Sequence, residues 1–124
     1  MEKAEIFKHW TDWASTFGTD LRATSKTWTI KALEIDALAR GIEKALGANA
    51  KRILEVGCGN GINCVELAER FPDTEFDGID FVPEMIDSAR KNGESSGASA
   101  RLRFFAGDVL KLEELTELHT EYDA

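Results

Sequence analysis

The stretch that most constrains this chain runs from Ile53 to Asn63, with the sequence Ile-Leu-Glu-Val-Gly-Cys-Gly-Asn-Gly-Ile-Asn. An apolar run of strand character breaks there into three alternating glycines, Gly57, Gly59 and Gly61. Glycine has no Cβ, so such a loop can adopt positive φ and let another molecule lie against bare peptide. Apolar residues at helical spacing follow, and Pro72 ends them. A strand, a glycine loop and a helix in this order predict a ligand cradle at the carboxyl end of a strand in an open α/β sheet.

The residues around the glycines narrow the class of ligand. A dinucleotide fingerprint would place glycine at the sixth position from Gly57, where Ile62 stands. A Walker loop would need Gly-Lys-Ser/Thr, which does not follow. Glu55 precedes the first glycine by two positions, and its charge would repel a pyrophosphate but attract an ammonium group. The loop therefore favours a ligand that carries an ammonium group.

Two more acids stand where predicted strands end. Asp80 closes the alternating run 75–80 and precedes a helix that begins near Pro83. A carboxylate there can accept both hydroxyls of a ribose, or it can cap the helix. Asp108 follows a third apolar run and can cap a short helix that contains Leu112 and Leu115. The sequence leaves the capping and ligand-binding interpretations of both acids open.

Glu55 to Gly61, Asp80 and Asp108 together resemble the cofactor motifs of the class I S-adenosylmethionine-dependent methyltransferases. The resemblance implies an α/β, Rossmann-like three-layer sandwich with a mostly parallel sheet. This chain would carry the first three to four strands of the seven-stranded fold, after N-terminal helices. It also implies S-adenosylmethionine as cofactor and methyl transfer to an unidentified acceptor, which we expect to be a small molecule.

The family pattern implies a role for each matching residue. Glu55 would orient the amino acid part of the cofactor, and Asp80 would bind the ribose. Asp108 would accept from the adenine amino group, while the Val109 amide would donate to a ring nitrogen. The predicted cofactor-binding set is Glu55, Gly57, Cys58, Gly59, Gly61, Asp80, Phe81, Met85, Asp108 and Val109.

Two other functions remain open at this stage. The chain could be a non-catalytic module or fragment that binds S-adenosylmethionine, or, less favoured, a nicotinamide-dinucleotide-binding domain. We assign no catalytic residue, because His9 and His119 lack a partner pattern, and no metal site. Cys58 and Cys64 lack a zinc spacing and are not expected to form a disulfide or act as nucleophiles.

Charge and hydropathy bear on partners and location. The formal net charge of −8, from 23 acidic and 15 basic residues, argues against a nucleic-acid substrate, because phosphate binding needs a basic surface. No apolar run approaches the length of a membrane span, and no signal-peptide pattern opens the chain. We expect a cytoplasmic protein without a membrane partner.

The N-terminal third divides into three predicted segments. Residues 2–17 carry one aromatic face, which either packs on the domain or forms a lid over the cofactor; the apolar positions are Ile6, Trp10, Trp13 and Phe17. Residues 21–29 are expected to be an extended linker or part of the lid, in which Arg22 or Lys26 could meet the cofactor carboxylate. A helix is predicted from Ile30 to Leu46, capped by Thr27 or Thr29. Its expected apolar side comprises Ile30, Leu33, Ala37, Leu38, Gly41, Ile42, Ala45 and Leu46. We therefore divide the chain into a lid and linker segment, 1–29, and a cofactor-binding domain, 30–124.

The far end predicts an interrupted sheet. Glu121 to Ala124 resembles the opening of the family's fourth strand, so we expect the domain to be truncated there. The first strand would then have an unpaired edge. Such an edge predicts a fragment of a longer protein, or a homodimer formed through that edge or by exchange of segments.

Overall fold

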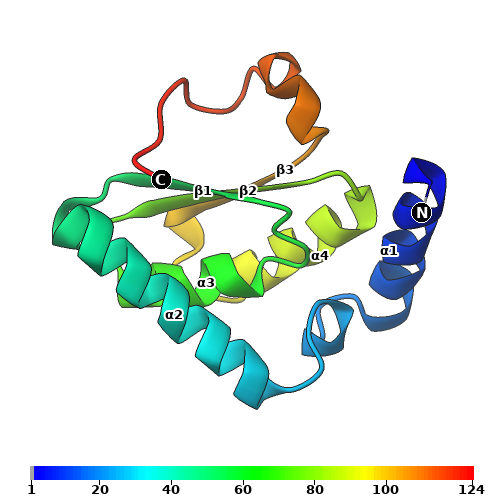
Figure 1. The fold of residues 1–124 in the computed structure, drawn as a ribbon, viewed down its shortest axis with the longest axis horizontal. Coiled ribbons are helices and arrows are strands. Elements are labelled where there is room, and N and C mark those ends of the chain that lie inside the picture. Colours follow the sequence, from blue (N-terminus) through cyan, green and yellow to red (C-terminus); the bar gives the residue numbers. More distant parts are fainter. Residues whose placement is uncertain (1) are drawn as a thin grey trace.

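A computed structural model describes residues 2–124 and shows one parallel sheet with its helices packed on one face (Figure 1). The strands lie in the order β1-β2-β3 and are β1 (Arg52–Val56), β2 (Glu75–Asp80) and β3 (Leu102–Ala106). The α-helices are α1 (Lys3–Phe17), α2 (Trp28–Leu46), α3 (Ile62–Arg70) and α4 (Pro83–Glu94). Short 3-10 turns are η1 (Leu21–Ala23), η2 (Gly47–Asn49), η3 (Ser99–Arg101) and η4 (Val109–Glu114). The predicted α/β class with preceding N-terminal helices is confirmed. Among residues 2–124, no helix has both the length and the apolar character to cross a membrane.

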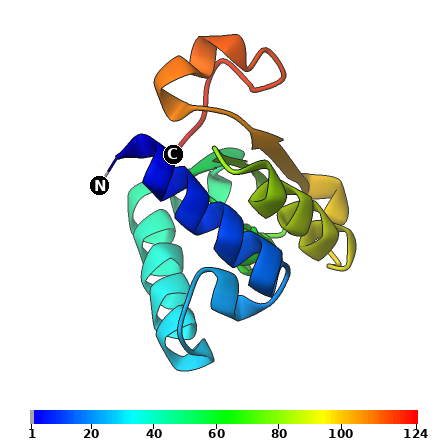
Figure 2. The same ribbon diagram turned by 90° about the vertical axis from the view of Figure 1, so that its right-hand side faces the viewer.

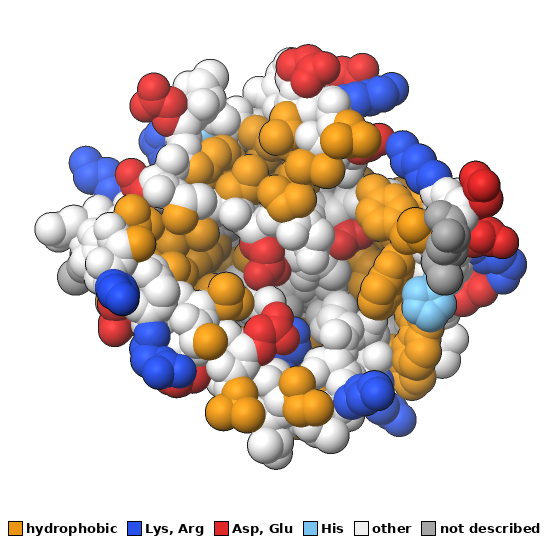
Figure 3. All heavy atoms as spheres, in the orientation of Figure 1, with side chains coloured by type: hydrophobic (Ala, Val, Ile, Leu, Met, Phe, Trp, Pro, Cys, Tyr) orange, Lys and Arg blue, Asp and Glu red, His pale blue; other side chains and the backbone are white. Residues whose placement is uncertain are grey.

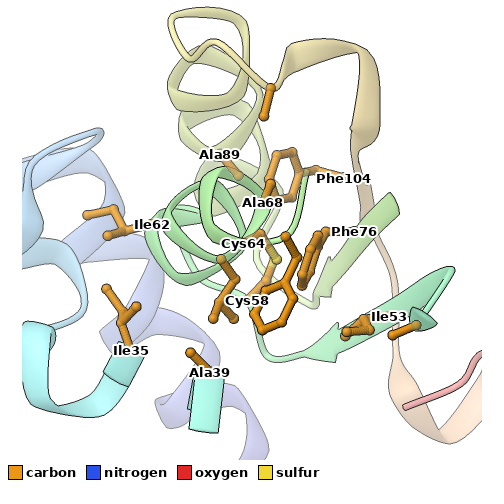
Figure 4. Packing of buried hydrophobic residues seen from close by; sticks show 14 of the residues in the cluster. Ile35, Ala39, Ile53, Cys58, Ile62, Cys64, Ala68, Phe76, Ala89 and Phe104 are labelled. Atoms are coloured by element: carbon orange, nitrogen blue, oxygen red, sulfur yellow. The ribbon is translucent and has the colours of Figure 1, made fainter. Parts of the chain in front are cut away.

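The main core fills the space between the sheet and the helices (Figure 4). Phe76 of β2 and Phe104 of β3 are 1% and 4% exposed, and Cys58 and Cys64 lie among them. At Gly78, in the middle of β2, an added Cβ would lie 2.8 Å from the Cys58 sulfur and from Phe104. A glycine is therefore needed there for the core to close at native packing density.

The opposite face of the sheet is covered by the C-terminal segment, residues 107–124 (Figure 1). A buried carboxylate, Asp77 of β2, ties this segment to the sheet. Arg103 Nε donates to Asp77 Oδ1 at 2.9 Å, and the Tyr122 hydroxyl donates to Oδ2 at 2.6 Å. The pairing satisfies a carboxylate that is only 2% exposed.

The outer edge of β1 is partly paired, contrary to the predicted bare edge. Asp123 N donates to the Arg52 carbonyl at 2.8 Å, and Leu54 N donates to the Ala124 carbonyl at 2.9 Å. The Asp123 carboxylate also accepts from the backbone amides of Lys51 and Arg52. The last residues thus lie where a fourth strand was predicted, and the edge stays open only towards Val56, which is 51% exposed.

Helix α2 has the predicted Thr27 cap but buries only part of the predicted apolar side, since Ile42 and Leu46 pack against the core. The Thr27 hydroxyl accepts from Ile30 N at 3.2 Å. The buried positions are Lys31, Ile35 and Ala39, whereas Ile30 and Leu33 are 53% and 67% exposed. The first half of the helix was predicted wrongly because a lysine occupies its inward face, and a hydrophobic pattern assigns lysine to the surface.

Residues 21–29 are not extended, although the sequence predicted an extended linker or part of a lid there. They form turn η1, whose Leu21 and Ala23 are buried, and they pack on the glycine loop. Asn60 Nδ2 donates to the carbonyls of Gly18, at 3.1 Å, and Asp20, at 2.8 Å. Figure 2 shows the consequence: α1 crosses in front of the carboxyl ends of the strands, between α2 and α4.

Candidate functional site

The glycine loop between β1 and α3 forms the floor of the candidate site. Gly57, Gly59 and Gly61 all have positive φ, at 73°, 54° and 77°. A Cβ at Gly61 would strike Phe104, and one at Gly59 would lie 2.5 Å from the Thr24 methyl group. At Gly57, by contrast, no atom of the described chain lies within 4 Å of an added Cβ. Gly57 is thus the position where a ligand can approach the loop, and the other two glycines serve close packing.

A cavity of about 300 Å³ opens over this loop at the carboxyl ends of β1 and β2. It is lined by Trp10, Thr24, Lys31, Glu34, Gly57, Cys58, Gly59, Asn63, Asp80, Phe81 and Met85. A larger hollow, about 600 Å³, lies at the opposite ends of the strands, beside Lys51 and Asp123. Parallel α/β sheets bind their ligands at the carboxyl ends of strands, so the glycine-loop cavity is the candidate site.

The structure brings most of the predicted residues together here. Six of them line the cavity: Gly57, Cys58, Gly59, Asp80, Phe81 and Met85. Glu55 does not line the cavity but accepts a hydrogen bond from Asn63, which does. Gly61 turns towards the core, while Asp108 and Val109 lie on the neighbouring loop after β3 and do not line the cavity.

Beside Glu55 is a charged cluster that the sequence analysis missed. Asn63 Nδ2 donates to Glu55 Oε2 at 3.1 Å and to Glu34 Oε1 at 2.9 Å. Lys31 Nζ donates to Asn63 Oδ1 at 3.1 Å and pairs with Glu34 at 3.2 Å. The only trace of this cluster in the sequence is a Lys-Glu pair three residues apart within the predicted helix.

Burial in this cluster raises the pKa of Glu55 to about 7. The hydrogen bond from Asn63 and the charge of Lys31 oppose the shift, while the Glu34 carboxylate adds to it. Glu34 and Lys31 thus line one corner of the cavity, and Glu55 is joined to this corner through Asn63. This arrangement is complementary to a zwitterionic amino acid, whose ammonium and carboxylate could pair with the acids and with Lys31 respectively.

Asp80 holds the glycine loop at the other side of the cavity. Its Oδ2 accepts from Gly59 N and its Oδ1 from Val82 N, each at 3.0 Å. Each oxygen keeps a second lone pair, so the carboxylate can also accept from ligand hydroxyls. Helix α4 begins at Pro83 after the N-cap residue Val82 and has no side-chain cap, so the predicted helix cap is wrong, and Asp80 instead closes a turn with the Val82 amide. The ribose interpretation stays a prediction.

Asp108 is likewise engaged within the chain. Its Oδ1 accepts from Leu110 N at 3.0 Å, which confirms the predicted cap, although the turn that follows is 3-10. Its Oδ2 pairs with Lys3 Nζ of α1 at 2.8 Å. Helix α1 is therefore attached to the loop where an adenine amino group was predicted to bind.

The remaining candidates have other partners. Arg22 pairs with Asp20 at 3.0 Å, and neither Arg22 nor Lys26 lines the cavity, whereas Lys31 does. Burial raises the pKa of both cysteine thiols, Cys58 and Cys64, far above neutral pH. A buried thiol that stays protonated is a poor nucleophile, in agreement with the sequence analysis.

The names of curated relatives of this chain denote different activities. The demethylmenaquinone methyltransferase of Thermus thermophilus is 36% identical over 97 residues, which is 78% of this chain and 37% of the relative. The trimethylguanosine synthase of Saccharomyces cerevisiae is 29% identical over 117 residues, which is 90% of this chain and 36% of the relative. The chain thus spans little more than a third of the length of either protein.

Solved structures share the fold. A methyltransferase for an amino pentose from Micromonospora echinaspora, with S-adenosylmethionine bound, is 33% identical with a TM-score of 0.51, over 68% of this chain and 30% of that one. A protein described as an O-methyltransferase from Klebsiella pneumoniae is 19% identical with a TM-score of 0.64, over 95% of this chain and 50% of that one. A family model described as a methyltransferase domain matches residues 48–124, more than half of the chain. The chain therefore belongs to the methyltransferase domain family and has the Rossmann-like fold of class I S-adenosylmethionine-dependent methyltransferases.

Proposed function

We propose that this chain binds S-adenosylmethionine in the glycine-loop cavity and takes part in methyl transfer to a small-molecule acceptor. The observation that carries the proposal is the charge pattern along the cavity. A corner complementary to an amino acid zwitterion lies at one side, and a carboxylate suited to ribose hydroxyls lies at the other. An amino acid joined to a nucleoside is the ligand that matches both ends.

Each residue has a defined role in this proposal. Glu55 and Glu34 bind the ammonium group, and Lys31 binds the carboxylate. Gly57 gives the ligand access to the loop, while Asp80 accepts the ribose hydroxyls.

The loop residues Gly59 and Gly61 shape the floor. Phe81, Met85 and Cys58 form the wall, and Asp108 with the Val109 amide binds the adenine. Residues 1–29 act as a lid on the cofactor domain, 30–124.

S-adenosylmethionine supplies a methyl group on a sulfonium, which is already a good electrophile. The residues of this chain therefore have to hold the donor in line with the acceptor and keep water out. Lys31, at 3% exposed, and the buried η1 turn provide a rigid, largely dry surround for the amino acid end. We assign no general base.

The proposal of a small-molecule acceptor rests on charge. A net charge of −8 disfavours a polyphosphate backbone, because such a backbone needs cations to neutralise it. The names of the two relatives denote different activities, so the relatives do not decide which acceptor this chain uses.

Calorimetric titration of this chain with S-adenosylmethionine, S-adenosylhomocysteine and NAD tests the cofactor. The first two ligands are expected to bind and NAD is not. Lys31→Met should weaken binding at least about tenfold, since a charged hydrogen bond is lost. The matched control is Lys44→Met, on the exposed side of the same helix, which should bind as the unchanged chain does.

Two outcomes would overturn the proposal. One is tighter binding of NAD than of S-adenosylhomocysteine. The other is equal affinity in the Lys31→Met and Lys44→Met variants, with both shown to be folded by circular dichroism. Methyl transfer to an added acceptor then separates an enzyme from a non-catalytic binding module.

A further inference from the structure

A second hollow adjoins the glycine-loop cavity. It is a trough of about 380 Å³ between α1 and the residues after η1. Its lining comprises His9, Trp10, Trp13, Phe17, Arg22, Ala23, Thr24, Ser25 and Lys26. Trp10 and Thr24 line both hollows, so the two share a wall. Figure 3 shows hydrophobic side chains gathered along α1, beside a central hollow with acidic side chains on its floor.

The apolar wall of the trough is almost entirely aromatic. The Trp13 and Phe17 rings stack, with centroids 4.7 Å apart and an interplanar angle of 25°. The His9 ring meets Trp10 and Trp13 edge-on, at 5.0 and 5.8 Å. Trp10 and Trp13 each remain 37% exposed. Rings held in place by one another lose little conformational freedom on binding, and their faces and edges suit a flat ligand better than a flexible aliphatic one.

The charge of the trough is opposite in sign to that of the whole chain. Its lining contains no acidic residue, although the net charge of the chain is −8. The Arg22 guanidinium lies over the Phe17 ring at 5.1 Å and is paired with Asp20. For Lys26, no ion pair is found with any carboxylate in residues 2–124. Lys26 is therefore available to an anionic group on a bound molecule.

We propose that this trough binds the methyl acceptor, and that the acceptor is a planar aromatic molecule carrying an anionic group, a phenolate or a carboxylate. The inference rests on the proposed function, since the shared wall of Trp10 and Thr24 places the trough beside the methyl donor. A phenolate oxygen would form the new bond to the methyl carbon while the carbon–sulfur bond breaks and sulfur keeps the electron pair. A carboxylate is already ionised at neutral pH, and a phenol would lose its proton to solvent on binding beside Lys26, so the transfer step itself removes no proton.

Calorimetry with three matched probes tests the class of ligand. The probes are 2-naphthoate, the neutral 2-naphthamide, and octanoate, each titrated with and without saturating S-adenosylhomocysteine. 2-Naphthoate is expected to bind at least about fivefold more tightly than either other probe, because only it satisfies both the rings and Lys26. S-adenosylhomocysteine should leave its affinity unchanged or raise it.

Two pairs of variants locate the binding. Lys26→Met should lower the affinity for 2-naphthoate to that for 2-naphthamide and leave 2-naphthamide unaffected, whereas Lys44→Met should change neither. Trp13→Leu keeps an apolar side chain and should weaken both naphthyl probes about tenfold. Trp28→Leu, at an exposed tryptophan outside the trough, is its control.

The inference is wrong if 2-naphthoate does not bind at millimolar concentration, if octanoate binds equally well, or if each variant behaves as its control does. Competition between 2-naphthoate and S-adenosylhomocysteine would also overturn it, because the probe would then occupy the cofactor cavity. The proposed function fails separately, when S-adenosylhomocysteine itself does not bind while 2-naphthoate still does.

Discussion

At the residue scale, the protonation of Glu55 is expected to make ligand affinity depend on pH. Its carboxyl group contacts Asn63 and Cys64, and the charges of Lys31 and Glu34 lie nearby. Burial raises the pKa of Glu55 to about 7, so the acid is partly protonated at neutral pH in the ligand-free chain. An ammonium group on a ligand needs the ionised form, so ligand binding must release a proton.

We therefore predict that affinity for S-adenosylhomocysteine falls as pH drops below about 7, approaching about tenfold per pH unit. Glu55→Gln should bind more weakly at pH 8 and show little dependence on pH down to 5.5. Glu34 provides the contrast, because Asn63 and Lys31 hold its pKa below the ordinary value despite partial burial, and it stays ionised over this range. If the affinity of Glu55→Gln depends on pH as strongly as that of the unchanged chain, the proton released on binding comes from another group.

The same pKa predicts a change in folding stability. The folded chain keeps a proton on Glu55 that the unfolded chain loses near the ordinary value of 4.5, so stability falls as pH rises from there to about 7. Glu55→Gln removes the cost of ionising a buried acid. It should be more stable than the unchanged chain at pH 8, by at most about 3 kcal/mol, and equal to it near pH 4. Urea unfolding at the two pH values measures the difference.

At the scale of elements, the N-terminal segment and the glycine loop form one unit. Asn60 is fully buried and donates to two carbonyls of the segment, those of Gly18 and Asp20. Asn92 of α4 adds hydrogen bonds to Thr19 and to the Asn60 carbonyl. A small second core joins α1, η1 and the start of α4, through Ala14, Ala23, Val82 and Met85.

Asn60→Ala should release this segment. Two carbonyls would lose their donor, at a cost of about 1–3 kcal/mol in the free energy of unfolding. Hydrogen exchange of the amides of residues 18–24 should speed up more than that of the β2 amides. Ligand affinity should fall, because Thr24 would no longer pack against Gly59. Asn49→Ala, at an exposed asparagine, is the control. Uniform acceleration over the whole chain would indicate a loss of global stability in place of local release.

The elements also show what the sequence could and could not predict. Strand, loop and helix boundaries around Glu55, Asp80 and Asp108 follow from periodicity, glycine and proline, which are local signals. The inward face of α2 does not follow from such local signals. Lys31 is buried there because it pairs with Glu34 and Asn63, which lie 3 and 32 positions further along the chain. Turn η1 was missed for a similar reason: its order depends on Asn60, roughly 40 residues along the chain. Tertiary pairing of polar groups is invisible to a pattern of apolar residues.

At the scale of the whole molecule, the two faces of the sheet are covered unequally. Helices cover one face with a continuous core, while the C-terminal segment covers the other through few contacts (Figure 1). Asp77 is one anchor of that segment, through Tyr122, and it also pairs with Arg103 of β3. Asp123 and Ala124 add hydrogen bonds to the Lys51–Leu54 stretch. Burial, followed by the hydrogen bond to Asp77, raises the pKa of Tyr122 to about 12, so the hydroxyl stays a donor throughout the physiological range.

Tyr122→Phe should therefore loosen the C-terminal segment while the helix-covered core stays intact. The lost hydrogen bond goes to a charged acceptor, which is worth about 1.5–3 kcal/mol, and Arg103 still neutralises Asp77. The Leu54 amide, which donates to the Ala124 carbonyl, should exchange faster, and the amides of α3 should be unchanged.

The uncovered edge of β1 should also promote pairing with a second copy, detected by sedimentation as concentration rises. The control is Glu121→Gln, at the exposed residue before Tyr122, which should neither speed the exchange of Leu54 nor promote association. If Leu54 stays protected in Tyr122→Phe, Asp123 alone suffices to hold the segment against β1, and the anchor lies in the backbone pairing.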